Sequence, residues 1–361
     1  MKYLQDFRDK SKVKALEEAI EKFSLPSFVF MEVCGTHTWS IFHHGLRSLF
    51  PHWMKHLSGP GCPVCVTPNE VIDYAIELTL KEKVILATFG DMLKVPGSYM
   101  SLREVRAKGG KIRVIYSVED ALKIAKNFPG QPVVFLGIGF ETTAPSIAWA
   151  VLKAREEGIK NFYILPANKL IPPAIREILK GNPNLDGFLL PGHVSTIIGR
   201  TPYLFISEEF HKGGVISGFE PLDILFSLYL LLKMKKDDSP RIVNQYKRSV
   251  KEEGNPKAKM IMKKVFKVVD SKWRGLGMIP ASGLDLKDEF REFNAYHVFP
   301  LNIPPSQEYP GCRCGEVLAG KIVPPECPLF GKVCTPEDPK GPCMVSVEGA
   351  CGIYYRYGGQ D

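Results

Sequence analysis

The chain has 361 residues, of which 45% are hydrophobic and 24% are charged, a composition typical of a globular protein with two or three domains. The net charge of +8 comes mostly from lysines spread over predicted helices, so we expect no nucleic acid partner. Residues 1–24 lack the apolar segment of a signal peptide, and the most apolar run, 222–232, is too short to span a bilayer. We therefore expect a cytoplasmic protein without a membrane partner.

Short apolar runs predict strands that are buried on both faces, because most are continuous and rich in β-forming residues. They cover residues 28–35, 84–91, 111–117, 132–140, 162–168, 187–193 and 213–219. Helical patterns separate several of them, at 68–82, 119–127, 144–157 and 172–180. This alternation predicts an α/β fold with largely parallel sheets, and we interpret run 222–232 as a buried helix.

The Pro-Gly stretch at 127–132 suggests a boundary between two Rossmann-like α/β domains. We place the first domain at residues 25–128 and the second at residues 129–235.

The remainder of the chain changes character. Residues 237–265 are lysine-rich and helical in pattern, and from residue 300 the chain is rich in proline, glycine and cysteine. Such a segment cannot build a large core alone, so we expect a metal or a cluster to hold it. We predict a smaller helical and loop-rich domain at 236–361, joined by an N-terminal helix at 1–24.

Each predicted strand ends in a small or polar motif, and ligands of open α/β sheets bind at the carboxyl ends of strands. Candidate site residues at these ends are Cys34, His37, Glu141 and His193, with Asp91 as a further strand-end carboxylate. Cys34 is an inert buried thiol, one half of a Cys-His nucleophile pair, or a ligand for a soft metal. For Glu141 the alternative is a helix cap formed by the threonines after it, and for His193 a core or capping role.

The cysteines indicate metal, cluster or redox chemistry, since there are nine without a secretion signal. Cys62 and Cys65 form a C-x-x-C motif, which suits a reversible disulfide or half of a metal site. Thr67 and Glu70 are spaced as a capping box, which predicts a helix N-terminus that lowers the thiol pKa of Cys65.

Six more cysteines lie in the last fifty residues: Cys312, Cys314, Cys327, Cys334, Cys343 and Cys351. Their loops suit an iron–sulfur cluster, with zinc or free thiols as alternatives, and four ligands suffice.

Five motifs together resemble the HypD family of hydrogenase maturation proteins. They are "MEVCGTHTWSIFHHGL", "SGPGCPVCVTP", "GFETT", "PGHVSTIIG" and "ECPLFGKVCTPEDPKGPCMVSVEGAC". The resemblance covers nearly the whole chain. It implies two α/β domains and a third part with a [4Fe-4S] cluster, which together act with HypC as a scaffold for the Fe(CN)2CO group of [NiFe] hydrogenases. HypE, with HypF upstream, delivers the cyanide.

The same resemblance implies roles for single residues. Cys34 holds the iron of the transient Fe(CN)2CO cargo, and Cys62 and Cys65 are a redox pair. The cluster ligands that match best are Cys314, Cys327, Cys334 and Cys351, whereas Cys312 and Cys343 are left out. His37, Glu141 and His193 are expected to hydrogen-bond or protonate the bound diatomic ligands.

The chain is therefore expected to be a redox-active assembly scaffold rather than a conventional turnover enzyme. Two alternatives remain open: a cluster-dependent thiol–disulfide reductase that gives Cys34 no role, and a zinc-stabilised scaffold that only recruits partners. Trp39, Ile41 and Phe42 either form a dock for HypC or begin a core helix.

Overall fold

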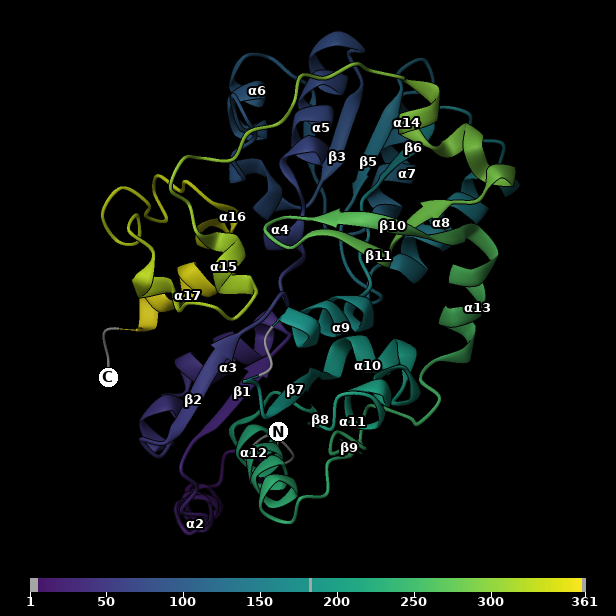
Figure 1. Ribbon diagram of the computed structural model, residues 1–361. Coiled ribbons are helices and arrows are strands. Elements are labelled where there is room, and N and C mark those ends of the chain that lie inside the picture. The colour runs from purple at the N-terminus through teal and green to yellow at the C-terminus, as the bar shows by residue number, and fades with distance from the viewer. Residues whose placement is uncertain (1–5, 182–183, 359–361) are drawn as a thin grey trace.

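The computed structural model describes residues 6–181 and 184–358, so residues 1–5 of the predicted N-terminal helix and 359–361 of the predicted third domain lie outside the described residues. Figure 1 shows two sheets joined by several chain crossings, a hairpin between them, and the cysteine-rich C-terminal segment along one side. The α/β fold with parallel sheets is confirmed.

Sheet A has five parallel strands in the order β2-β1-β7-β8-β9. Their bounds are β1 Phe28–Glu32, β2 Met54–Ser58, β7 Gly187–Pro191, β8 Gly213–Ser217 and β9 Ile242–Asn244. Helix α12 (Pro221–Lys236) packs against β7 and β8, and its leucines share a core cluster with Phe28 and Phe30 of β1. The prediction of a buried helix over 222–232 is therefore confirmed.

Sheet B has four parallel strands in the order β4-β3-β5-β6. Their bounds are β3 Ile85–Thr88, β4 Ile112–Val114, β5 Val133–Gly137 and β6 Phe162–Pro166. All seven predicted apolar runs thus contain a strand of one sheet or the other. The four predicted helical stretches are helices too: α5 Asn69–Lys81, α7 Val118–Asn127, α8 Ala144–Glu156 and α9 Ile171–Gly181.

The boundary expected at residues 128–129 does not separate the two sheets. Strand β1 pairs with β7, and β3 pairs with β5, so each sheet takes strands from both sides of that boundary. The chain passes from sheet A to sheet B after β2 and returns after β6. The Pro-Gly stretch only connects α7 to β5 within sheet B.

Several elements were not predicted. Strands β2 and β9 are short, and β10 (Phe266–Trp273) pairs with β11 (Gly277–Leu286) as an antiparallel hairpin. The lysine-rich stretch is helical only at α13 (Pro256–Val265). The hairpin reaches the C-x-x-C loop at its tip, where Arg274 Nε donates to the Thr67 carbonyl at 2.8 Å.

The C-terminal segment, residues 312–357, consists of short helices and loops. These helices are α15 Cys314–Leu318, η5 Pro324–Glu326, α16 Pro342–Val345 and α17 Ala350–Tyr357. Helix α17 packs on α3 (Gly35–His43), and α16 packs on α4 (Pro63–Val66). The segment is thereby held against the two loops that carry Cys34 and the C-x-x-C motif.

The other helices cover sheet edges and connections. They are α2 Lys10–Glu21, η1 Leu46–Leu49, η2 Gly90–Lys94, α6 Leu102–Ala107, α10 Gly192–Ile198, η3 Thr201–Tyr203, α11 Phe205–Glu208, η4 Asp288–Phe293 and α14 Ala295–Val298. Among the helices of the described residues, none combines the length and the apolar character that a membrane span requires.

Candidate functional site

A cavity of about 380 Å3 lies where the carboxyl ends of strands from both sheets meet. Cys34 follows β1, residues 140–143 follow β5, and His193 follows β7, and all of these segments line the cavity. In sheet A the strand order reverses between β1 and β7, and such a switch point is where open α/β sheets bind ligands.

Cys34 is the only cysteine that lines this cavity among the described residues, and its side chain is 8% exposed. Its backbone N–H donates to Glu32 Oε2 at 2.9 Å. Burial, followed by the negative charges of Glu348 and Glu32, raises the pKa of the Cys34 thiol to about 12. The sulfur is therefore protonated at neutral pH.

Gly61 is in close contact with the Cys34 backbone. A Cβ at Gly61 would lie 2.4 Å from the Cys34 Cα, a distance that no side chain can occupy. The glycine lets the C-x-x-C loop pass directly beside Cys34, and Gly61 and Pro63 also line the cavity.

His37 does not line the cavity. Its Nε2–H donates to the Gly218 carbonyl at 3.0 Å, and its ring packs against Phe219 at 4.7 Å between centroids. Burial lowers the pKa of His37 to about 4, so the imidazole is neutral. The ring supports the loop after β8, and a Cys34–His37 nucleophile pair is not formed.

His193 lines the cavity together with Cys34. Its ring stacks on the same Phe219, with 4.1 Å between centroids. Burial lowers the pKa of His193, so a neutral imidazole faces the cavity at pH 7.

Glu141 lies behind the cavity wall. Its Oε1 accepts the Ile171 backbone N–H at 3.1 Å at the start of α9, while Oε2 has no hydrogen-bond partner. Burial raises the pKa of Glu141 to about 7. Of the threonines that follow, Thr143 occupies the N-cap position of α8, as the alternative predicted, but its side chain makes no cap hydrogen bond. Asp91 accepts a hydrogen bond from Ser346 Oγ at 3.1 Å.

Cys62 and Cys65 form a disulfide across the first turn of α4. Both are buried, at 3% and 0% exposure. The predicted capping box is wrong: Thr67 Oγ1 donates to the Pro63 carbonyl, and α5 begins at Asn69 with Pro68 as its N-cap residue and no side-chain cap. Pro68 separates the two helices, so Thr67 ends α4 rather than starting α5.

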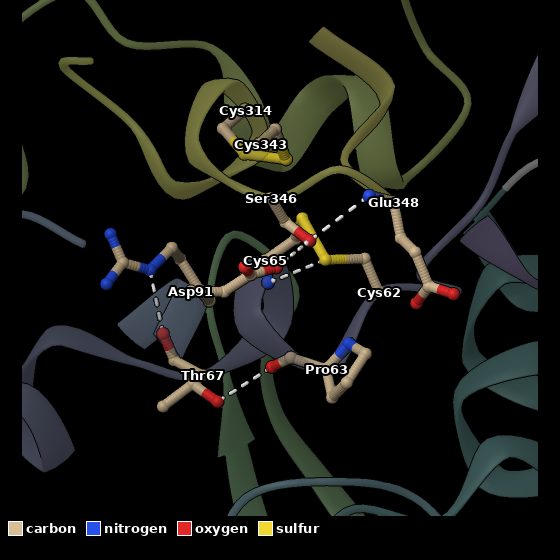
Figure 2. The surroundings of a disulfide bond; sticks show 10 residues. Cys62, Pro63, Cys65, Thr67, Asp91, Cys314, Cys343, Ser346 and Glu348 are labelled. Atoms are coloured by element: carbon tan, nitrogen blue, oxygen red, sulfur yellow. Dashed lines mark hydrogen bonds between the residues drawn. A yellow bond between two sulfur atoms is a disulfide. The ribbon is translucent and has the colours of Figure 1, made fainter. Parts of the chain in front are cut away.

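A second disulfide joins Cys314 of α15 to Cys343 of α16. Figure 2 shows it facing the Cys62–Cys65 disulfide, with Ser346 between the two. A sulfur bonded in a disulfide is not a free thiolate, so this structure removes Cys314 from the predicted ligand set. Nothing in the 29-residue separation of the pair indicates this bond in the sequence.

The four other C-terminal cysteines carry free thiols and line one cavity with the second disulfide. They are Cys312, Cys327, Cys334 and Cys351. Burial mainly raises the pKa of Cys312 to about 11, and the charges of Cys327 and Cys334 add to the effect. Four free thiols that line one cavity match the number of ligands that an iron–sulfur cluster takes. No three His, Cys, Asp or Glu side chains in the described ranges converge as closely as a single metal ion requires.

Sequence reasoning missed Glu348. Its Oε1 accepts the Thr36 hydroxyl at 2.8 Å, and it lines the Cys34 cavity. A Cβ at Gly35 would lie 2.4 Å from the Glu348 Cβ, so the two backbones are in close contact. Burial raises the pKa of Glu348. Because Glu348 lies more than 300 positions from Cys34 in the chain, no local pattern links them.

The fold and the site together define a parallel α/β protein with a buried thiol at a strand-end cavity and a cysteine-rich segment docked beside it. The chain belongs to the HypD family: the family model described as "Hydrogenase formation hypA family" matches residues 11–358.

Similar proteins cover almost the whole chain. Hydrogenase maturation factor HypD2 of Bradyrhizobium diazoefficiens is 43% identical over 99% of this chain and 97% of its own. Hydrogenase expression/formation protein HupD of Azotobacter chroococcum is 43% identical over 100% and 98%. Hydrogenase maturation factor HypD of Escherichia coli is 41% identical over 100% and 99%.

Proposed function

We propose that this chain is the scaffold on which the Fe(CN)2CO group of [NiFe] hydrogenases is assembled, in a stable complex with HypC. One observation carries the proposal: a buried thiol, Cys34, shares a strand-end cavity with His193 and Glu348. The cavity has room for an iron with small diatomic ligands. HypE, with HypF upstream, is the transient cyanide donor, and the cytoplasm is the compartment.

The environment of Cys34 suits a metal ligand better than a nucleophile. A thiol with a pKa near 12 is a poor nucleophile at pH 7, but binding a metal cation offsets the charges of Glu348 and Glu32 and releases the thiol proton. A soft thiolate suits iron that carries cyanide and carbon monoxide. A thiolate of HypC would enter from the open side of the cavity as a second ligand.

The residues around the cavity take different parts. The neutral imidazole of His193 and the Glu348 carboxyl would contact bound diatomic ligands. His37 would act by packing and hydrogen-bonding to Gly218, which fixes the start of α3. Glu141 would act indirectly: its hydrogen bond to Ile171 would hold the start of α9 in place behind Thr142 and Thr143, which line the cavity.

The cysteines supply the redox part of the proposal. Cys312, Cys327, Cys334 and Cys351 would hold a [4Fe-4S] cluster, which supplies single electrons when bound. The Cys314–Cys343 disulfide lines the same cavity, and α16 packs on α4. Cys62 and Cys65 would be the two-electron site of the scaffold, since uptake of two electrons and two protons breaks their S–S bond and gives two thiols beside the Cys34 cavity.

Infrared spectroscopy of the anaerobically purified complex with HypC tests this function. We expect cyanide and carbonyl stretching bands, and we expect Cys34→Ala to lose them while the visible absorption of the cluster remains. Retention of the bands in Cys34→Ala would contradict the iron site. Full maturation activity in Cys34→Ser would favour the cluster-dependent thiol–disulfide reductase, and zinc instead of iron in elemental analysis would favour the recruiting scaffold.

A further inference from the structure

A second cavity, of about 510 Å3, lies between the start of sheet A and the C-terminal segment. One wall comes from residues 47–56, which include η1 and β2, and the other from Val323, Pro325, Tyr354 and Gly358. The side chains that carry or can take a positive charge are Arg47, His52, Lys55 and His56. None of the described residues that line this basic pocket is Asp or Glu. A concave surface of one charge sign favours an anionic ligand.

His56 is the buried member of this set. His56 is 6% exposed, and its ring stacks on the Phe30 ring with 5.1 Å between the centroids. Neither ring nitrogen has a hydrogen-bond partner. Buried polar atoms are nearly always hydrogen-bonded in folded proteins. We therefore expect a ligand in the pocket to supply the hydrogen-bond acceptor that His56 lacks.

The position of the Glu32 carboxylate indicates which His56 nitrogen is left for a ligand. His56 Nε2 lies 3.8 Å from Glu32 Oε1, so one nitrogen faces a carboxylate inside the protein. The second ring nitrogen, Nδ1, is therefore the one left to donate to an anion in the pocket.

Arg47 and His52 add groups suited to an oxyanion. The Arg47 guanidinium lies over the Phe42 and Tyr354 rings, 4.8 and 5.3 Å from their centroids. A guanidinium presents a planar fork of donors that matches phosphate and carboxylate. His52 is exposed at the pocket and can donate from the solvent side.

We propose that the basic pocket binds an oxyanion, the phosphate or carboxylate group of a small ligand, with His56 as its buried donor. The bound group would join β2 to helix α17 and so bridge sheet A and the C-terminal segment. Glu32, which lies beside His56, also accepts the Cys34 N–H.

Calorimetric titration of the full chain at low ionic strength tests the proposal, with inorganic phosphate and acetate as separate probes. We expect saturable binding of at least one probe, and the probe that binds identifies the source of the oxyanion. His56→Phe keeps the ring packing on Phe30 and should weaken binding about tenfold or more, since it removes a hydrogen bond to a charged group. His52→Gln, at an exposed position, should weaken binding about threefold and still fold.

His211→Asn is the matched control, because His211 is exposed, lies outside the pocket and has φ 53°, which asparagine tolerates. We expect this variant to bind as the unmodified chain does. The proposal is overturned if neither probe saturates, or if His211→Asn weakens binding as much as His52→Gln does. If His56→Phe does not fold, the comparison of His52→Gln with His211→Asn decides.

Discussion

Cys34 and the C-terminal cysteines are held in place by different kinds of structure. Cys34 follows a strand that is paired on both sides and packed beneath large apolar clusters. The C-terminal cysteines lie on short helices (Cys314, Cys343 and Cys351) or in the loops between them (Cys312, Cys327 and Cys334), and they are surrounded mainly by one another and a few apolar side chains. A paired sheet keeps its geometry without a ligand, whereas a segment of short helices and loops that adds no strand to either sheet is expected to depend more on bonds to sulfur. We therefore expect the two regions to respond differently to the same kind of damage.

The largest contrast should come from removing two of the free thiols, in Cys327→Ser/Cys334→Ser. In the anaerobically purified chain, the local opening free energy of residues 312–357 should fall by more than about 3 kcal/mol, because metal binding contributes directly to folding. Amide hydrogen exchange of β1 and β7 should stay slow. Unchanged protection of the C-terminal segment would show that it folds without the four thiols.

A second change damages the contact between Cys34 and the C-x-x-C loop within the sheet region. Gly61→Ala places a Cβ on the Cys34 backbone and should lower the free energy of unfolding by about 3 kcal/mol, the upper part of the range for overpacking. Chemical denaturation measures the loss. Gly130→Ala is the control, since a Cβ there meets nothing within 4 Å, and equal stability of the two variants would argue against the contact.

Glu141 tests the sheet region alone. Burial raises its pKa from the ordinary value near 4.5 to about 7, so the folded chain binds this proton more tightly than the unfolded chain. The Glu141 contribution to stability is therefore lost as pH rises from about 4.5 through 7, by up to about 3 kcal/mol.

Glu141→Gln keeps an acceptor for the Ile171 N–H and removes the titration. We expect this variant to be more stable than the unmodified chain at pH 8 and to have a flatter stability profile between pH 5 and 8. Parallel profiles in denaturant unfolding would contradict the assignment.

The smallest effect concerns the charge that the C-terminal segment places beside Cys34. Glu348→Gln removes a negative charge that raises the Cys34 pKa, so the pKa should fall and alkylation of Cys34 by iodoacetamide at pH 9 should speed up about threefold to tenfold. Peptide mass spectrometry measures the rate. Glu337→Gln, an exposed site on the same segment, should leave it unchanged, and equal rates in all three proteins would contradict the role of Glu348.

Local patterns predicted most of the regular structure. The apolar runs that contain β1, β3 and β5 are continuous and bounded by polar motifs, which is a strong signal for buried strands. Strand β2 has the sequence "MKHLS", which carries almost no such signal, because pairing with β1 rather than its own residues makes it a strand. The hairpin β10–β11 is similar, since polar and apolar residues mix along β11 without a regular strand pattern.

The site was predicted only in part, for a related reason. Cys34 and His193 were expected at strand ends, and sheet topology brings them into one cavity. His37 is only three residues from Cys34, yet its ring turns toward Gly218 because it lies in the first turn of α3. Glu348 reaches the cavity through the packing of the C-terminal segment on Gly35, which no spacing in the chain encodes.

The residue types of the sequence by themselves determined that strands and helices alternate, that small and polar motifs follow the strands, and that most of the cysteines gather in the C-terminal part. Only the tertiary structure decided which strands share a sheet, which two C-terminal cysteines pair, and which side chains face Cys34. The physical reason is range. Apolar periodicity and turn residues act within a few positions, whereas sheet order, the Cys314–Cys343 bond and the Glu348–Thr36 contact join residues that meet only when the whole chain has packed.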